Sequence, residues 1–214
     1  MSNLYKNLSI RKEKMEEILD IIEGFKVQKI LLEEQTRHPK FLRIDRLKVK
    51  LQNGKILTRE LIVKNGKKGS AVVMLPMSEA KDVLLVIEPR IATARTVGIG
   101  LPAGYIEEGE SPVYAALREL REETGYTTNE HNAIELASFY QDSGCSQAFN
   151  HAFLMQNCQK THNQDLDKDE FIKYVTCHYD EALYLMEQGY INDSNSIITL
   201  EKSKKYVKEL GGIK

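Results

Sequence analysis

The sequence predicts a mixed β-sheet covered by helices, an α/β or α+β layer architecture. Apolar runs of strand length follow one another through the middle of the chain, and helical patterns precede, interrupt and follow them. The chain has 214 residues, of which 42% are hydrophobic and 29% charged, an ordinary globular composition that can bury a substantial core. One principal domain with a modest N-terminal extension fits this length best.

The N-terminal region is expected to contain a helix and a hairpin. Apolar residues recur at helical spacing over residues 10–22, and Gly24 is the expected stop. Two strand-like stretches flank a dipeptide favoured in tight turns, because both of its residues tolerate positive φ. In chain order these are residues 41–51, Asn53-Gly54 and residues 55–64. The pattern predicts an amphipathic helix followed by a β-hairpin.

The rest of the chain alternates predicted strands with polar turns before two closing helices. Apolar runs bounded by turn residues indicate five strands, at residues 70–77, 82–90, 134–141, 149–157 and 170–179. A polar turn at residues 78–81 separates the first two, and the polar stretch from His162 to Asp169 predicts a loop. Helical patterns near residues 180–189 and 194–210 end the chain.

A helix from about Pro112 to Glu123 is well specified locally. Ser111 can cap its N-terminus, and Pro112 needs no amide donor at the first helical position. Gly125 stands where a left-handed C-terminal cap would lie. At helical spacing the apolar stripe consists of Val113, Ala116, Leu117 and Leu120.

Three glutamates, Glu119, Glu122 and Glu123, border this stripe. Like charges at these spacings destabilise a helix by a few tenths of a kcal/mol per pair, and the macrodipole disfavours anions in its second half. Local stability therefore does not explain them. Several carboxylates on one rigid element suit a hard divalent cation such as Mg²⁺ or Mn²⁺ together with substrate phosphates. The alternative is a solvated acidic face with Arg118 and Arg121 as partial counter-ions.

The stretch from Gly104 to Tyr126 resembles the Nudix box. That signature is glycine, five residues, glutamate, seven residues, then arginine, glutamate, an aliphatic residue, any residue, two glutamates, any residue, glycine and an aliphatic residue. The matching positions are Gly104, Glu110, Arg118, Glu119, Leu120, Glu122, Glu123 and Gly125, and only Tyr126 departs. The resemblance implies a Nudix fold, with a mixed sheet sandwiched between helices (α/β/α). It also implies a hydrolase that splits the diphosphate linkage of a nucleoside diphosphate joined to another group.

The resemblance also implies roles for the motif. The implied metal ligands are the carbonyl of Ala103 and the carboxylates of Glu119, Glu122 and Glu123, with Glu119 and Glu123 the principal ones and Glu122 bound directly or through water. The implied structural positions are Gly104, Glu110, Arg118 and Gly125, with Arg118 orienting a neighbouring glutamate. Mg²⁺, or Mn²⁺ in its place, would neutralise the diphosphate oxygens and activate water for attack on phosphorus.

The flanking segments are similar to ADP-ribose pyrophosphatases and related nucleotide-sugar hydrolases, over roughly Leu42 to Leu200. This similarity implies hydrolysis of ADP-ribose to AMP and ribose 5-phosphate. It makes Arg59 and Arg90 candidates to bind the phosphates or the terminal ribose, because the planar fork of arginine grips phosphate oxygens. Two alternatives stay open: another nucleotide sugar such as GDP-mannose, and a non-catalytic Nudix module that binds a nucleotide sugar.

A glutamate in the late loop is the proposed general base in this subfamily, and Glu170 occupies that position. Asp167 and Asp169 are close rivals, because loop geometry decides which carboxylate reaches the water. The subfamily often has serine, proline, glycine and a later glutamate after the fifth strand. This chain has Ser143 in place of the proline and Gln147 near the usual glutamate. This departure argues against ADP-ribose as the specific substrate and leaves the hydrolase assignment intact.

Composition argues against several other classes of protein. Thirty basic and thirty-one acidic side chains give a formal net charge of -1, so no global field attracts nucleic acid or an anionic membrane. No stretch approaches the roughly 18 apolar residues of a membrane span, and the N-terminus lacks a signal-peptide core, so a cytoplasmic protein is expected. Cys145, Cys158 and Cys177 lack CxxC spacing and are expected to be reduced thiols.

Two regions are predicted. Residues 1–66 form an N-terminal helix and hairpin region, and residues 67–214 form the Nudix hydrolase domain. In related nucleotide-sugar hydrolases such an N-terminal region packs against a partner subunit. The resemblance therefore implies a homodimer.

Overall fold

The structure is a computed structural model that describes residues 8–26, 42–64 and 69–209. Its helices are α1 (Lys12–Phe25), α2 (Pro112–Thr124), the 3-10 turn η2 (Glu130–Asn132), α3 (Tyr179–Glu187) and α4 (Ser194–Glu209). Its strands are β1 (Leu42–Lys50), β2 (Ile56–Lys64), β3 (Ala71–Pro76), β4 (Asp82–Pro89), β5 (Val97–Gly100), β6 (Ala103–Tyr105), β7 (Tyr126–Thr127), β8 (Ala133–Tyr140), β9 (Phe149–Met155), β10 (Gln159–Lys160) and β11 (Lys173–His178). None of the described helices is both long and apolar enough to cross a membrane.

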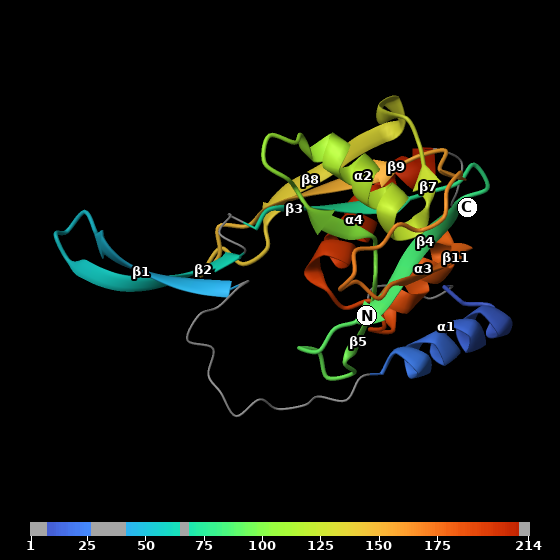
Figure 1. The fold of residues 1–214 in the computed structure, drawn as a ribbon, viewed down its shortest axis with the longest axis horizontal. Helices are drawn as coiled ribbons and strands as arrows, with labels where there is room; N and C mark the ends of the chain where they lie inside the picture. The colour runs from blue at the N-terminus through green and yellow to red at the C-terminus, as the bar shows by residue number, and fades with distance from the viewer. Residues whose placement is uncertain (1–7, 27–41, 65–68, 210–214) are drawn as a thin grey trace.

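The predicted mixed architecture is confirmed, but the strands form two main sheets instead of one (Figure 1). A four-stranded sheet has the order β6-β3-β9-β8, and a three-stranded sheet has the order β11-β4-β5. β3 and β9 are parallel, whereas the other pairs in these sheets are antiparallel. Two further sheets have two strands each, the long hairpin β1-β2 and the short pair β10-β7.

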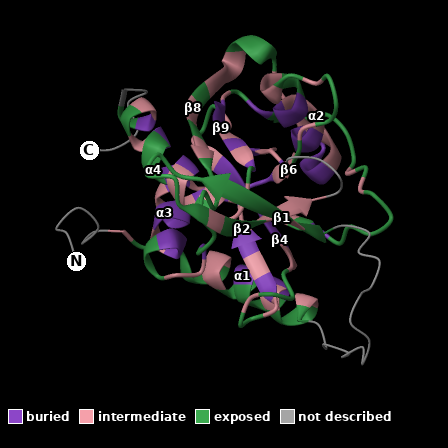
Figure 2. Cartoon of the chain, turned by 90° about the vertical axis from the view of Figure 1, so that its left-hand side faces the viewer, coloured by how far each residue is buried: buried purple, intermediate pink, exposed green. Residues whose placement is uncertain are grey.

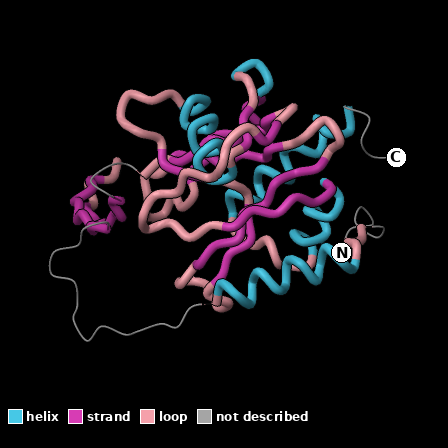
Figure 3. Tube along the Cα trace, turned by 45° about the vertical axis from the view of Figure 1, so that its right-hand side comes forward, coloured by secondary structure: helices cyan, strands magenta, loops and turns pink. Residues whose placement is uncertain are grey.

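Helices cover both faces of the four-stranded sheet. α2 packs on one face, against β3, β6 and β9, while α4 packs against β3, β8 and β9. α1 and α3 pack on the three-stranded sheet, against β4 and β11 (Figures 1 and 3). The sheets therefore lie between α2 and the group of α1, α3 and α4.

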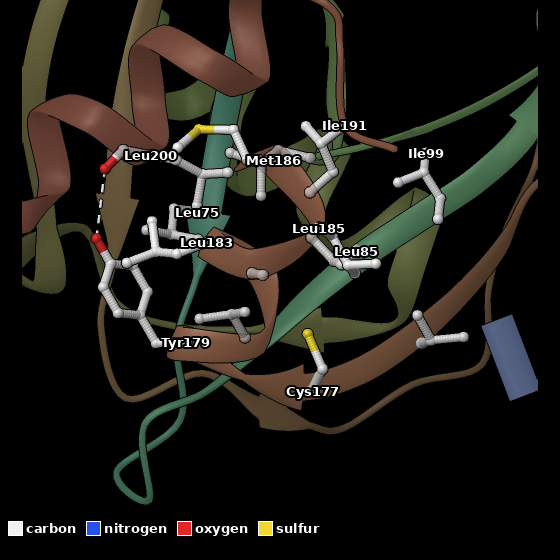
Figure 4. Close-up of a cluster of buried hydrophobic side chains, with 14 of the residues drawn as sticks. Leu75, Leu85, Ile99, Cys177, Tyr179, Leu183, Leu185, Met186, Ile191 and Leu200 are labelled. Carbon is white, nitrogen blue, oxygen red and sulfur yellow. Dashed lines mark hydrogen bonds between the residues drawn. The ribbon is translucent and has the colours of Figure 1, made fainter. Parts of the chain in front are cut away.

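β3 is central because both of its faces are buried. Successive side chains of a strand point to opposite faces. Val72 and Met74 accordingly pack in the cluster that holds the apolar side of α2, whereas Val73 and Leu75 pack in the larger cluster on the other side. Figure 4 shows that larger cluster, where the Tyr179 hydroxyl donates a hydrogen bond to the Leu200 carbonyl at 3.3 Å. Burial on both faces explains why β3 reads as an uninterrupted apolar run.

The β1-β2 hairpin extends away from the helices and main sheets (Figures 1 and 3). Its strands pair antiparallel from Leu42 opposite Lys64 to Lys50 opposite Ile56. In the turn Gly54 has a φ of 81°, whereas Asn53 is not among the positive-φ residues of the described chain, so only half of the expected turn pair adopts that conformation. Most of the hairpin is exposed (Figure 2).

Several element boundaries differ from the sequence-based expectation. α1 continues through Gly24 to Phe25, so Gly24 does not stop the helix. Ser111 is the N-cap residue of α2, but its side chain makes no capping hydrogen bond. The last strand begins at Lys173, which leaves Glu170 in the preceding loop. The expected domain boundary after residue 66 and the expected helix end at residue 210 lie outside the described residues.

Four short strands were not predicted: β5, β6, β7 and β10. They have two to four residues each; β6, β7 and β10 pair with strands distant in sequence, whereas β5 pairs with the preceding strand β4. Periodicity cannot identify such short segments. The three cysteines are free thiols, as expected.

The start of α1 is attached to α3 by Arg11 and Glu181. The backbone amide, Nε and Nη2 of Arg11 all donate to the Glu181 carboxylate, at 3.0, 2.8 and 2.9 Å. Burial alone would raise the pKa of Glu181, but the hydrogen bonds from Arg11 and from the His178 amide lower it to about 2. Ionised Glu181 therefore stabilises this attachment.

We expect Arg11→Met to lower the free energy of unfolding at neutral pH, because it removes the partner of Glu181; the effect should be small, since the Arg11 side chain is largely exposed. The pKa of Glu181 in the folded protein lies below its ordinary 4.5, so the ionised carboxylate contributes fully above pH 4.5. That contribution is lost as the pH falls toward about 2, and the difference between variant and wild type should shrink over this range. Urea unfolding at several pH values measures it. Arg46→Met, which removes an exposed pair with Glu60 on the hairpin, is the matched control. A pH-independent effect of Arg11→Met would contradict the interpretation.

Candidate active site

A cavity of about 1100 Å³ opens where the two sheets, α2 and α4 meet. Its lining comes mainly from the end of β4, from β5, from the β6 turn, from α2, from the loop before β11 and from the N-terminus of α4, and residues at the end of β2, the start of β3 and the start of β9 add to it. Of the predicted site residues, the described cleft lining includes Arg90, Ala103, Gly104, Glu110, Arg118, Glu119, Glu123 and Glu170. Segments from across the whole second part of the chain therefore contribute to one cleft.

Gly104 and Glu119 fit together at the contact between β6 and α2. A Cβ placed on Gly104 would lie only 1.9 Å from the Glu119 carboxyl carbon and 2.1 and 2.3 Å from its two oxygens. Gly104 has an ordinary backbone conformation, so glycine is required here for space. The missing side chain is what admits the Glu119 carboxylate to the cleft floor.

Arg118 connects three of the predicted glutamates. Its Nε and Nη2 donate to the two carboxylate oxygens of Glu110, both at 3.0 Å. Its Nη1 donates to Glu119 at 2.8 Å and to Glu122 at 3.0 Å, and Nη2 also donates to the Tyr105 carbonyl at 2.9 Å. The structural roles of Arg118 and Glu110 stay predictions, which this bidentate contact supports.

Glu119 and Glu123 are buried although both carry carboxylates. They are 9% and 4% exposed. Burial is the largest cause that raises the pKa of each, and neighbouring carboxylates, including Glu170, raise it further. The Ala103 amide donates to Glu123 at 3.1 Å and opposes part of this effect. The cleft floor therefore holds carboxylates whose cost of ionisation is not fully offset by the positive charge and donors around them.

Glu88 is a further acidic residue of the cleft that the sequence reasoning missed. It lies near the end of β4, where burial raises its pKa, and it adds to the raised pKa of Glu123. Its carboxylate forms an ion pair with Arg90 Nη2 at 2.5 Å. Its position at the end of a buried strand, two residues before a candidate phosphate-binding arginine, is the signal that could have identified it.

The aliphatic part of the Arg90 side chain packs against Gly98 on the neighbouring strand β5. A Cβ on Gly98 would lie 2.6 Å from the Cγ of Arg90. Glycine at residue 98 thus leaves room for the Arg90 stem, and the pair with Glu88 sets the direction of the guanidinium. Arg90 also lowers the raised pKa of Tyr105, whose main cause is burial, so its charge reaches the β6 side of the cleft.

The loop before β11 contributes Glu170 together with both of its rivals. Asp167, Asp169 and Glu170 all line the cleft. The Glu170 carboxylate accepts from the Asp167 amide at 3.1 Å, and the Glu170 amide donates to the Asp167 carbonyl at 3.0 Å. Of the three, Glu170 is the carboxylate whose charge raises the pKa values of Glu88, Glu119 and Glu123.

Two predicted residues differ in location from the rest. Glu122 is on α2 beside the cleft, where Arg118 and Arg121 donate to it at 3.0 and 3.2 Å, and it is not among the lining residues that the structure describes. Arg59 is exposed on β2, opposite Leu47, and its Nη1 donates to the Thr58 carbonyl at 3.0 Å. Arg59 is likewise not part of the described cleft lining of the same chain.

The donor set fits a hard divalent cation. The available ligands on α2 are carboxylate oxygens, and two of them are desolvated with raised pKa values, which a nearby cation would relieve. As the side chains lie, no three acidic, histidine or cysteine residues of the described chain converge at metal-binding distance. Arg118 draws Glu119 and Glu122 to one side, and the Ala103 amide draws Glu123 to another. Metal ligation by these carboxylates therefore requires their side chains to turn from these positions, and the metal-ligand roles stay predictions.

Comparison with known proteins gives the family. A family model described as NUDIX domain matches residues 67–198. The chain therefore belongs to the Nudix family, and it is a Nudix diphosphohydrolase. An ADP-ribose pyrophosphatase of Bacillus subtilis (strain 168) is 31% identical over 175 residues, covering 81% of this chain and 91% of that protein. A methanol dehydrogenase activator of Bacillus methanolicus is 31% identical over 154 residues, covering 72% of this chain and 80% of that protein.

A solved structure confirms the predicted Nudix fold. The crystal structure of an ADP compounds hydrolase superposes with a TM-score of 0.71 and covers 84% of this chain and 94% of that chain. The two sequences are 19% identical, so this comparison supports the fold alone.

We expect Gly104→Ala to reduce turnover of a nucleoside diphosphate sugar by about 100-fold, because the added methyl group displaces the Glu119 carboxylate from its place at the cleft floor. Steady-state kinetics measure the loss, and thermal unfolding checks the fold. Gly24→Ala is the control, since a Cβ there meets nothing within 4 Å. Full activity of Gly104→Ala would show that the position of Glu119 does not matter for turnover.

Proposed function

We propose that the protein hydrolyses ADP-ribose to AMP and ribose 5-phosphate in a Mg²⁺-dependent reaction, with Mn²⁺ able to replace Mg²⁺. The observation that carries the proposal is the buried pair Glu119 and Glu123 at the floor of a cleft that also contains Arg90 and Glu170. The choice of substrate is supported by the Bacillus subtilis relative, which is an ADP-ribose pyrophosphatase.

The reaction adds one water molecule across the P–O–P linkage. The attacking water forms a bond to one phosphorus, the bridging oxygen leaves with the other phosphate, and the proton of the water passes to a base. Mg²⁺ would neutralise the diphosphate oxygens and make the water more acidic. Glu119 and Glu123 would hold it as principal ligands, with Glu122 and the Ala103 carbonyl as further ligands. Arg90, oriented by Glu88 at 2.5 Å, would bind the phosphates or the terminal ribose.

Glu170 is the proposed base. Its charge reaches the carboxylates of α2, whereas Asp167 and Asp169 are not among the groups that affect them. A base must reach the water that lies beside the metal ligands. This electrostatic proximity favours Glu170 over its two rivals.

We also propose that the chain forms a homodimer through the hairpin of the N-terminal region. Large apolar side chains are exposed on both faces of the hairpin, and the proposed interface is the face that carries Leu47, Val49 and Arg59; Leu42, Ile44 and Ile56 are exposed on the opposite face. An exposed apolar surface of this kind is a common feature of protein interfaces. Because Arg59 is not part of the described cleft of its own chain, its proposed contact with substrate requires the hairpin to reach the cleft of a second copy.

We expect purified protein with ADP-ribose and Mg²⁺ to release AMP and ribose 5-phosphate, separated and quantified by chromatography, and a chelator to abolish turnover. Glu119→Gln and Glu123→Gln should each lower kcat by about 100-fold or more, because each removes charge that stabilises the bound cation. Glu108→Gln, in the exposed turn before α2, is the control.

The same assay separates the alternatives. A higher kcat/KM for GDP-mannose or another nucleotide sugar would replace ADP-ribose as the substrate. Binding of nucleotide sugars without turnover of any of them would indicate a non-catalytic module. Undiminished turnover in both glutamate variants would contradict the metal-ligand roles.

For the dimer, we expect multi-angle light scattering to give twice the chain mass for wild type and a single chain mass for a Leu47→Glu, Val49→Glu variant. These two side chains lie on the same face of the hairpin as Arg59, and two buried charges would disrupt an apolar interface. Lys48→Glu, on the opposite face, should leave the dimer intact. A monomeric wild-type protein would refute this proposal and leave the hydrolase proposal unaffected.

A further inference from the structure

The segment from Lys160 to Ile172 is docked on the C-terminal end of α2. The last carbonyls of a helix have no partners within the helix. Here the last three of them each receive a donor from this segment. The Asp165 amide donates to Glu122 O at 2.9 Å, and Gln164 Nε2 donates to Glu123 O at 2.6 Å. Lys160 Nζ donates to Thr124 O at 2.6 Å. The segment thus completes the hydrogen bonding of the helix that carries the acidic residues.

Lys160 is itself held in place by two aromatic rings. Its ammonium group lies 4.6 Å from the ring centre of Tyr174 and 5.5 Å from that of Tyr126. The positive charge lies at the negative end of the helix dipole, which is a favourable arrangement. The Thr161 and His162 amides both donate to Gly125 O, at 3.1 and 3.0 Å. The first part of the segment is therefore fixed on the helix end.

Gln164 differs from these contacts because its amide joins two separate elements. The same Nε2 atom donates to Glu123 O at 2.6 Å and to Ile172 O at 3.3 Å. Ile172 is buried at the far end of the loop that carries Glu170. Gln164 stands just before the loop of residues 165–172, and Ile172 is the last residue of that loop. The Gln164 side chain therefore links both ends of the loop to the backbone of Glu123, whose carboxylate lies at the cleft floor.

We propose that Gln164 is a positioning residue that fixes the loop of residues 165–172 relative to α2. It holds the Glu170 carboxylate at a constant separation from Glu119 and Glu123. The inference rests on the proposed function, in which Glu170 accepts the proton of the attacking water. Gln164 acts through Glu170 and contacts no reacting atom.

The rest of the loop has contacts consistent with this arrangement. Its tip is closed internally by the paired hydrogen bonds between Asp167 and Glu170. Beside Glu170, the Phe171 ring stacks on Phe25 of α1, with 4.5 Å between ring centres. Phe171 is nevertheless 62% exposed, so this stack limits the loop on one side only. Two polar links join the loop to α2, the Asp165 amide on Glu122 O and the Gln164 amide on Glu123 O, and of these two the Gln164 amide also reaches the far end of the loop at Ile172.

The test uses two variants that keep the size of the side chain. Gln164→Met removes the donor, and Gln164→Glu replaces it with an acceptor that faces two carbonyls. Gln159→Met, on the exposed neighbouring strand β10, is the matched control. Hydrogen exchange should become faster in residues 165–172 of both Gln164 variants. With the loop free to shift by about 1 Å, kcat should fall by roughly 10- to 100-fold while KM changes less than about twofold.

A double-mutant cycle tells a positioning role from general destabilisation. If Gln164 acts through Glu170, then Gln164→Met should cost little further activity when introduced into Glu170→Gln. The same loss of kcat in both backgrounds would overturn the proposal, as would faster loop exchange with unchanged kcat. If Gln164→Met does not fold, the cycle is made with Gln164→Glu.

The inference and the proposed function fail in different ways. If wild type turns over a nucleotide sugar other than ADP-ribose, the substrate assignment fails and the cycle is measured on that substrate. If Glu170→Gln retains full kcat, the base assignment fails and the role of Gln164 fails with it. Unchanged exchange in residues 165–172 of both variants would overturn the inference whatever the substrate.

Discussion

The structure depends on one electrostatic constraint, the burial of like-charged carboxylates at one end of a helix. Glu119 and Glu123 are both desolvated, which raises the pKa of each, and the charge of Glu119 raises the pKa of Glu123 further. Three kinds of group hold them in place: the Arg118 guanidinium, the Ala103 amide, and the space left by Gly104. Such an arrangement is unfavourable for stability on its own, which is typical of a functional site that a bound cation completes.

The rest of the fold can be understood as support for that helix. The apolar side of α2 packs on β3 and β9, so its axis is fixed by the central sheet. Its C-terminal carbonyls receive donors from the Lys160–Ile172 segment, and the β6 turn supplies the glycine beside Glu119. The site is therefore built from rigid elements on three sides, and rigid support of this kind sets the separation between reacting groups.

The sequence predicted the elements that are specified by residues close to one another in the chain. The helix from Pro112 was visible because Pro112, the apolar spacing and Gly125 all act within a few residues, and Gly125 has the expected left-handed φ of 70°. The strands β3 and β4 were visible because each buries a continuous apolar run. The short strands β5, β6, β7 and β10 were not predicted, since each is too short to show a periodic pattern and is defined by its pairing with another strand. Ser111 is the N-cap residue, but its side chain makes no hydrogen bond to the helix, so the expected capping role was wrong.

The sequence by itself determined the acidic helix, the glycine that precedes it and the family to which they belong, because spacing along one helix fixes which side chains share a face. Only the tertiary structure decided that Glu88 joins this site, that Glu170 lies closer to it electrostatically than Asp167 and Asp169, and that Arg59 is outside the described cleft of its own chain. The physical reason is that these residues come from separate strands and loops. Their separation depends on sheet pairing and loop packing, which no short stretch of sequence records.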